Sequence, residues 1–279
     1  MSFYISLSGL KASQVDLATI SNNVSNVSST AFKKSKTIFG DIFAAAPMQT
    51  TNQVAGQGVR VQGVTQQFTQ GTLETTDKTL DLAIAGEGYF TVKGEDGTIS
   101  YTRNGAFAVD DNRFAVDTTG ARIQIFPVDP QTGVTTIDPT TATPANLVDL
   151  NIPTNNPNTP TAQLTSVGVD KKGLVSAVYA DGSTLYLGQV AMASFNSQEG
   201  LRQEGDAHWS ATVASGNPLL GTANQGMYGS VNSGMLERSN VDITDELVAL
   251  IAAQRNFQAN SKAIEAANTL TTTIVNLRT

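Results

Sequence analysis

The sequence predicts an α+β protein, with long N- and C-terminal helices paired as an antiparallel coiled coil and a central, mainly β domain. Both ends repeat apolar residues at alternating steps of three and four, which is the spacing of a coiled-coil seam. The middle alternates apolar and polar residues between turn signals. The composition agrees, because a chain with 40% hydrophobic residues, 15% charged residues and 24 glycines suits β-rich structure with many turns.

The first predicted helix covers residues 3–28. It is followed by a stretch rich in Asn, Ser and Thr, whose side chains compete for backbone hydrogen bonds and end the helix. The seam positions are Leu7, Leu10, Gln14, Leu17, Ser21 and Val24.

The last predicted helix covers residues 242–277. Asp242 or Thr244 is the expected N-cap, and acidic residues fill the first turn, where the helix dipole favours them. Its seam repeats the first one, with Gln and then Ser at equivalent places, which favours a role in setting register. The seam positions are Leu247, Leu250, Gln254, Phe257, Ser261 and Ile264.

A narrow apolar stripe needs a partner helix, and the simplest partner for one end of the chain is the other end. We therefore expect Leu10, Leu17, Leu250 and Phe257 to share one seam. An antiparallel pair would also bring the basic residues Lys33, Lys34 and Lys36 close to the acidic start of the last helix.

The sequence divides into three predicted regions. Residues 1–31 and 240–279 form the terminal helical domain, 32–57 a connecting arm, and 58–239 the central β domain, which includes a Pro-rich extended connector at 127–165. Gly86-Glu87-Gly88 lies between two apolar runs and predicts a hairpin turn. The Gly-rich stretch 200–234 predicts a loop that leads into the final helix.

Composition excludes several classes of function. A net charge of −7 argues against nucleic-acid binding, because phosphate backbones favour basic proteins. There is no cysteine, and no apolar run approaches the ~20 residues of a membrane span, so no membrane insertion is expected. The opening residues lack the basic-then-apolar pattern of a secretory signal, so export would need a route without a cleaved signal peptide.

The sequence predicts no catalytic, cofactor-binding or metal site, and hence no enzyme. His208 is the only histidine, and we interpret it with Trp209 as a surface or packed loop pair. Gly86-Glu87-Gly88 lacks the last glycine of a dinucleotide fingerprint and precedes a strand pattern. Two other classes stay open: an enzyme or carbohydrate-binding β domain, which a pocket of convergent carboxylates would support, and an adaptor that binds one partner coiled coil.

Four segments resemble the bacterial flagellar axial proteins, which are the rod, hook and hook-associated subunits. They lie in the family's order and cover both ends and most of the body. The segments are Ser21-Asn22-Asn23-Val24-Ser25-Asn26 with Thr30 and Phe32-Lys33, Asp81 to Phe90, Tyr101 to Phe107, and Glu237 to Asp242 continuing to Phe257. One departure is Ala31, where the family usually has glycine before the Phe-Lys pair; a Cβ there disfavours a turn with positive φ.

Within the family, hook sequence is the nearest resemblance. The matching segments are Met1-Ser2-Phe3, Phe39 to Ala44, Trp209 to Thr212, Leu219 to Ala223 and Ile274 to Arg278. Hook subunits normally carry an extra outer β domain, and the connector at 127–165 is too short to hold one. A chain below 300 residues with one β body is also the layout of the distal rod subunit, which is therefore the alternative.

The resemblance implies a structural subunit of the bacterial flagellar hook that self-assembles into a tubular axial filament and transmits motor torque; the alternative is the distal rod of the basal body. The implied partners are further copies of the chain, other axial proteins (rod and hook-associated proteins), a hook cap and the type III export apparatus. The implied location is the hook or basal body of the flagellum, on the extracellular side.

The same reasoning gives a set of expected subunit-interface residues. They are Leu7, Leu10, Leu17, Asn22, Asn23, Val24, Asn26, Phe32, Leu247, Leu250, Gln254, Phe257 and Ile264. The charge-free segment 44–57 follows the first helix, and we expect it to pack on the β body of a neighbouring subunit in a polymer that can curve.

Overall fold

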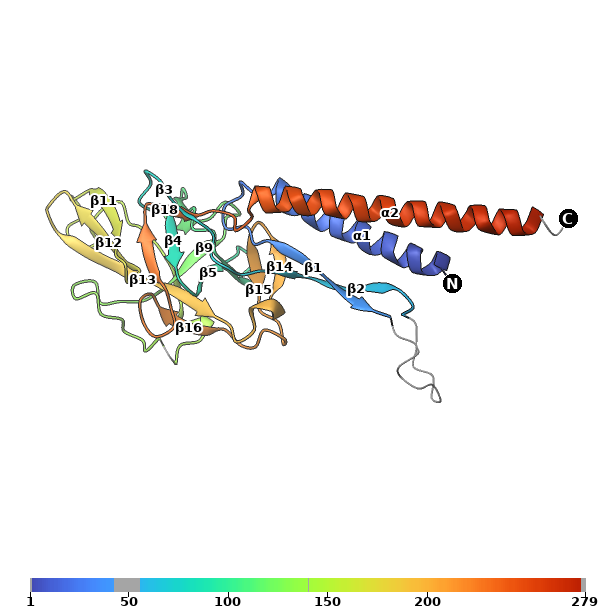
Figure 1. Cartoon of the computed structure of the whole chain (residues 1–279). Helices are drawn as coiled ribbons and strands as arrows, with labels where there is room; N and C mark the ends of the chain where they lie inside the picture. Colours follow the sequence, from blue (N-terminus) through green and yellow to red (C-terminus); the bar gives the residue numbers. More distant parts are fainter. Residues whose placement is uncertain (1, 43–55, 140, 277–279) are drawn as a thin grey trace. The chain divides into compact units, whose positions relative to one another are not determined.

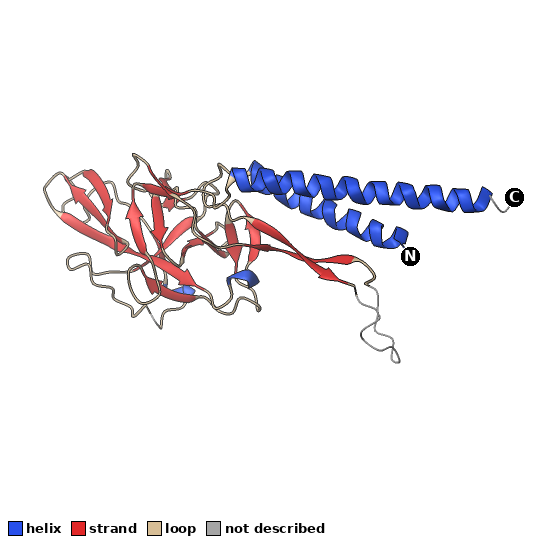
Figure 2. Cartoon of the chain, in the orientation of Figure 1, coloured by secondary structure: helices blue, strands red, loops and turns tan. Residues whose placement is uncertain are grey.

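The computed structural model describes residues 2–42, 56–139 and 141–276, which form two compact units. The helical unit comprises Met1–Ser28, Lys33–Phe68 and Val241–Thr279. The β unit comprises Ser29–Phe32 and Thr69–Asn240. Figure 2 shows the helices of the first unit and the many short strands of the second.

The two predicted terminal helices are confirmed. α1 spans Ser2–Ser25 and α2 spans Ile243–Asn276, and the two helices lie side by side (Figure 1). Asp242 caps α2, because its Oδ1 accepts hydrogen bonds from the backbone N–H groups of Thr244 at 2.8 Å and Asp245 at 3.3 Å. These bonds hold the pKa of Asp242 below its usual value. Among the described residues, no helix is long and apolar enough to cross a membrane.

An antiparallel hairpin completes the helical unit. β1 (Ser35–Asp41) pairs with β2 (Val59–Gln66), with a bulge between Ile38 and Phe39, and α1 contacts both strands. The structure thus groups β2 with the helices, whereas the sequence placed residue 58 onwards in the β domain, because β1 supplies the ladder partner of β2. Of the segment 44–57, residues 44–55 lie outside the described part of the chain.

The β unit is built on one large, mainly antiparallel sheet. Its main path runs β11-β12-β13-β9-β5-β6-β15-β14, and the smaller pairs β4–β17 and β3–β18 lie beside it. The bounds are β3 Leu73–Thr75, β4 Leu82–Ala85, β5 Tyr89–Lys93, β6 Ile99–Thr102, β7 Ala108–Val109, β8 Ala115–Val116, β9 Arg122–Phe126, β10 Val148–Asp149, β11 Leu164–Val169, β12 Leu174–Tyr179, β13 Thr184–Ser194, β14 Arg202–Gly205, β15 His208–Ser210, β16 Leu219–Thr222, β17 Ser230–Ser233 and β18 Met235–Glu237.

The principal apolar core of the chain lies inside this unit. Phe90, Ile123, Ile152, Val175 and Met192 are all at most 1% exposed and belong to one cluster. A second layer is aromatic, with the rings of Tyr89 and Trp209 5.8 Å apart in an edge-to-face arrangement. The β unit therefore has the burial that an independently folding domain needs.

Two expectations about turns are wrong. Gly86-Glu87-Gly88 does connect two strands, but β4 pairs with β17 and β5 pairs with β6, β9 and β13, so the turn changes sheet and closes no hairpin. The predicted loop 200–234 contains four short strands, β14 to β17. Distant partners explain part of both errors, because β17 pairs with β4 and β16 pairs with β13. β14 and β15 instead pair with each other across a two-residue turn.

The described residues of 127–165, the segment expected to be an extended connector, contain little regular structure. Within it the structure has a 3₁₀ turn at Pro144–Asn146 and the two-residue strand β10, and β11 begins at its end. Asn156 fastens the connector by donating a hydrogen bond to the hydroxyl of Ser183 at 2.8 Å.

Ala31 adopts the positive-φ turn that its Cβ disfavours. It is fully buried at φ 57°, and its N–H donates to the carbonyl oxygen of Glu237 at 2.8 Å. The surrounding β unit therefore holds Ala31 in a strained backbone conformation. This is the position at which the resemblance led us to expect glycine.

Candidate assembly surface

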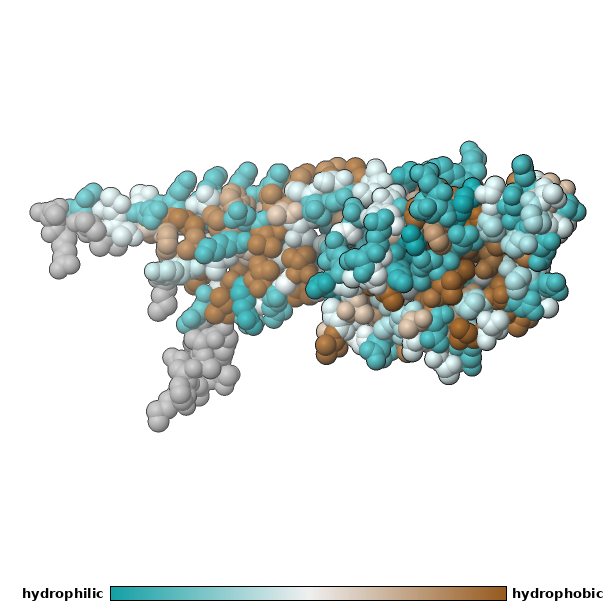
Figure 3. Space-filling view, turned by 180° about the vertical axis from the view of Figure 1, so that it is seen from behind, coloured by the Kyte–Doolittle hydropathy of each residue, from teal (hydrophilic) through white to brown (hydrophobic). Residues whose placement is uncertain are grey.

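Apolar side chains are distributed very differently in the two units. Within the described part of the helical unit, the buried apolar side chains are Ala12, Ile20, Val241 and Ala253. Yet this unit, little more than a third of the chain, holds 12 of the 18 exposed large apolar residues in the described part of the chain. Figure 3 shows apolar side chains over the helices and hairpin. Such an excess of exposed apolar surface is typical of an interaction site.

The N-terminal half of α2 carries the clearest part of this surface. Ile243, Leu247 and Ile251 follow one another at steps of four, so they share one side of the helix, and they are 48, 44 and 49% exposed. Val248, beside them, is 64% exposed. We call these four residues the α2 apolar stripe.

Small and polar residues lie between α1 and α2. A Cβ built on Gly9 would come within 2.7 Å of Asn260, and Asn23 donates a hydrogen bond to Glu246 at 3.1 Å. Ala12 and Ala253, at 6 and 2% exposure, are the buried alanines of the two helices. Residues of this size let two helix backbones approach closely.

The large residues of the predicted seam are not buried in the single chain. Leu7, Leu10, Leu17, Val24, Leu250, Ser261 and Ile264 are half-buried, and Gln14, Ser21, Leu247, Gln254 and Phe257 are exposed. The contacts between the two helices include those of Gly9 with Asn260 and of Asn23 with Glu246. The apolar seam positions that spacing picks out are consequently left at least partly open to other molecules.

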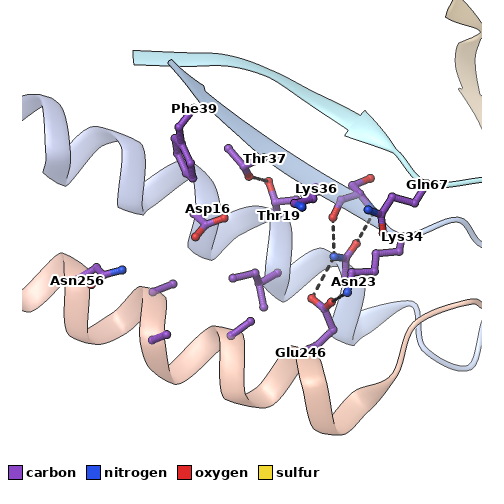
Figure 4. A pocket seen from close by; sticks show the side chains of 15 residues that line it. Asp16, Thr19, Asn23, Lys34, Lys36, Thr37, Phe39, Gln67, Glu246 and Asn256 are labelled. Carbon is purple, nitrogen blue, oxygen red and sulfur yellow. Dashed lines mark hydrogen bonds and ion pairs between the residues drawn. The ribbon is translucent and has the colours of Figure 1, made fainter. Parts of the chain in front are cut away.

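Asn23 is the centre of a polar network that joins α1, β1 and α2 (Figure 4). Its amide donates to the carbonyl oxygen of Ser35 at 2.8 Å, and its Oδ1 accepts from the N–H of Ser35 at 2.9 Å. The second amide hydrogen goes to Glu246. The Asn23 side chain thereby satisfies both backbone groups of Ser35, as a neighbouring strand would, and it is only 1% exposed.

An ion pair extends this network. Lys34 Nζ lies 2.5 Å from Glu246 Oε1, and the carboxylate of Glu246 is almost fully buried. This confirms that the basic stretch after the first helix lies close to the acidic start of the last one. On the other side of Asn23, Thr37 donates to the hydroxyl of Thr19 at 3.2 Å.

A cavity of about 440 Å³ lies beside the network, between α1, β1 and α2. Its α2 wall is made largely of alanine, and Phe39 of β1 lines it while remaining 42% exposed. The cavity exists because alanines face a helix and a strand that carry larger side chains. Its lining residues are Asp16, Thr19, Ile20, Asn23, Lys34, Ser35, Lys36, Thr37, Phe39, Gln67, Glu246, Ala249, Ala252, Ala253 and Asn256.

The remaining predicted interface residues have local roles. Asn22 is exposed, and its carbonyl oxygen accepts from the side chain of Asn26 at 3.0 Å, just past the end of α1. Phe32, half-buried in the β unit, accepts the N–H of Asn240 at 3.4 Å through its carbonyl oxygen. The sequence placed Glu246 in the acidic start of the last helix, close to the basic stretch, but did not predict its hydrogen bond with Asn23.

We expect a double-mutant cycle to show coupling between Asn23 and Glu246. Asn23→Ala removes three hydrogen bonds, and Glu246→Ala removes the ion-pair partner of Lys34 and the acceptor of one amide hydrogen of Asn23. Each change should lower the free energy of unfolding of the helical unit by about 1–3 kcal/mol. The double variant should lose about 1 kcal/mol less than the sum. Helix-detected urea denaturation measures this; strict additivity would show that the network is not a unit.

Convergent metal-binding groups are not found in the described ranges: no cluster of three His, Cys, Asp or Glu side chains lies close enough to hold a metal ion.

Three family models match the chain. The model "Flagella basal body rod protein" matches residues 3–33, "Flagellar hook protein FlgE/F/G D1 domain" residues 83–177, and "Flagellar basal body rod FlgEFG protein C-terminal" residues 232–277. The first range includes Asn23 and Phe32, and the third range contains the α2 apolar stripe.

Whole-chain relatives agree with these models. The basal-body rod protein FlgG of Bacillus subtilis is 34% identical over 99% of this chain and 98% of its own, and that of Buchnera aphidicola from Acyrthosiphon pisum is 33% identical over 94% of both. The hook protein FlgE of Salmonella typhimurium is 28% identical over 100% of both chains. The chain therefore belongs to the flagellar axial rod and hook protein family, whose members are self-assembling structural subunits of the flagellum and not enzymes.

Proposed function

We propose that this chain is a subunit of the flagellar hook, in which copies polymerise into a tube that curves while it transmits torque. The observation that carries the proposal is the exposed apolar surface of the helical unit, with the α2 apolar stripe at its centre. Association with further copies would bury this surface. The full-length match to a hook protein and the hook-like segments, Phe39 to Ala44 among them, support the hook over other axial positions.

Within each subunit we propose that α1 and α2 pair as an antiparallel coiled coil. Two contacts support this arrangement: Asn23, near the end of α1, bonds Glu246 near the start of α2, and Gly9, near the start of α1, faces Asn260 further along α2. The large seam residues, such as Leu10 and Leu17, would then turn towards neighbouring subunits. We also propose contacts with rod and hook-associated proteins and a hook cap, and export to the extracellular side through the type III apparatus without a cleaved signal peptide.

The distal rod is the second candidate, and length favours it. The rod proteins named above align over 276 and 294 positions, close to the 279 residues of this chain, whereas the hook alignment spans 410. Hook relatives therefore carry residues without a counterpart here. We propose that these correspond to an outer domain that this chain lacks.

Electron microscopy of the polymer formed by the full chain separates the two. A hook subunit should give tubes that curve, and deleting residues 46–55 should alter the shape of the tube more than the amount of polymer. A scrambled 46–55 segment of equal length is the matched control for loop length. Rigidly straight tubes that the deletion leaves unchanged would assign the chain to the rod.

A further inference from the structure

The only histidine of the chain is buried in the β unit. His208 opens β15 and is 6% exposed, so the expectation of a loop residue is wrong. Its Nε2 lies 2.6 Å from Oδ2 of Asp117, which follows β8 and is itself 5% exposed. The two residues are 91 positions apart, so only the fold brings them together.

The hydrogen bonds around the pair fix where the protons are. The Nδ1 atom of His208 lies 2.9 Å from the carbonyl oxygen of Asp206, which can only accept, so Nδ1 carries a hydrogen. The Oδ1 atom of Asp117 accepts from the N–H and hydroxyl of Thr119 and from the N–H of Ala121, at 2.8, 2.7 and 3.0 Å. An oxygen with three donors belongs to an ionised carboxylate, so Nε2 carries a hydrogen too, and the ring is an imidazolium.

This cation closes a strained turn. Asp206 and Ala207 connect β14 to β15 with φ values of 47° and 58°, which non-glycine residues seldom adopt. The turn is held by His208 at Asp206 and by Thr102, whose hydroxyl donates to the carbonyl oxygen of Ala207 at 2.8 Å. β14 has β15 as its ladder partner and forms one end of the main sheet path.

We propose that His208 is a proton-operated latch that, while protonated, ties the β14–β15 hairpin to the turn Asp117–Ala121. Loss of its proton removes one of the two hydrogen bonds, since a neutral imidazole has one N–H for two acceptors. The hairpin then loosens around Trp209, the next residue of β15, which is 1% exposed. The latch is a property of the β unit and does not depend on the hook assignment.

The charged groups around the His208 ring favour the protonated imidazolium. Burial alone would lower the pKa of His208, but the hydrogen bond and charge of Asp117, with the neighbouring Asp206, outweigh it and raise the pKa above 6.5. Glu204 on β14 is a third nearby carboxylate, and the residue facing His208 on β6 is the uncharged Thr102. Burial would raise the pKa of Asp117, yet the bonds from His208 and Thr119 lower it.

The sign of the pH dependence follows from these directions. A raised histidine pKa means that the stabilisation is complete below the unfolded value of 6.5 and is lost as pH rises through the folded value. A lowered aspartate pKa means that its contribution is present above 3.8 and is lost as pH falls through the folded value. The latch is therefore closed in mildly acidic solution and opens as pH rises through the folded pKa of His208, which lies above 6.5.

Nuclear magnetic resonance of the full chain labelled at histidine tests the latch without any substitution, because one histidine gives one set of signals. We expect both ring nitrogens to be protonated at pH 6.5, with a midpoint above that value. In Asp117→Asn the midpoint should move down. A wild-type midpoint at or below 6.5, or no movement in Asp117→Asn, would overturn the proposal.

His208→Gln is the matched variant for function, since its amide still donates to Asp117 but does not titrate. The unfolding constant of the wild type relative to His208→Gln should change by up to tenfold per pH unit across the folded midpoint. Trp209 fluorescence of the native state should change over the same interval in the wild type alone. The same pH profile in both proteins would contradict the latch.

Discussion

Replacing Leu250 by aspartate should abolish polymerisation while the β unit stays folded. Leu250 is half-buried in the helical unit, beside a surface that already exposes Leu247 and Ile251. If the polymer fills this position, loss of the leucine alone costs about 2–5 kcal/mol per subunit, and the unpaired carboxylate adds to it. Even the lower figure raises the critical concentration for assembly by roughly 30-fold.

The design separates assembly from folding. Sedimentation and electron microscopy report the polymer, and Trp209, buried in the β unit, reports its fold through fluorescence. The β unit should survive because its core cluster contains no residue of α1 or α2. Leu250→Met keeps the apolar volume and should assemble like the wild type. Normal filaments from Leu250→Asp would remove the basis for assembly through the helices.

The sequence predicted features that short segments determine by themselves. Both helices follow from their apolar period, and Asp242 is the N-cap because its carboxylate suits the first N–H groups of a helix. α1 ends at Ser25, three residues before the predicted end at residue 28. These features depend on neighbours in the chain.

Distant partners explain what the sequence did not predict. Spacing identified large apolar residues such as Leu10 and Leu17 as the shared seam, yet the close contact is made by small and polar residues such as Gly9 and Asn23. The apolar spacing identifies positions of large residues, but it carries no information on how closely two helix backbones approach. In the same way β4 pairs with β17, some 150 residues along the chain, and no turn signal encodes such a partner.

Part of the candidate site could be predicted from the sequence, and the part that depends on distant partners could not. Asn23 belonged to a recognisable motif, but its bonds to Ser35 and Glu246 require the folded arrangement. The pair His208–Asp117 had no sequence signal beyond the rarity of histidine. Another buried ion pair, between Arg103 and Glu237, links two segments that the family resemblance noted separately.

Replacing Glu237 by alanine should be the most damaging single change to the β unit. Glu237 and Arg103 are 0 and 3% exposed, and their charged groups are 3.4 Å apart. The other carboxylate oxygen accepts the N–H of Gly71 at 2.9 Å, and the guanidinium lies 5.2 Å from the ring centre of Tyr89. Glu237→Ala leaves a buried cation and a buried N–H without their acceptor. We expect a loss of about 3–5 kcal/mol in the free energy of unfolding, as for other broken buried pairs.

Variants at both positions distinguish two cases. In the first, the Arg103–Glu237 pair is itself stabilising; in the second, Glu237 is needed only because the buried charge of Arg103 requires a counter-charge. Glu237→Gln keeps an acceptor for Gly71 and should lose less than Glu237→Ala. The Nε–H of Arg103 has no acceptor among the described residues, so the pair is imperfectly satisfied. Arg103→Met combined with Glu237→Leu should therefore recover most of the stability lost by Glu237→Leu alone, because the double variant contains no unmatched charge. Urea denaturation followed at Trp209 measures each difference. A double variant that loses as much stability as the sum of the two single variants would show that Arg103 and Glu237 do not act as a coupled pair, and would contradict this account.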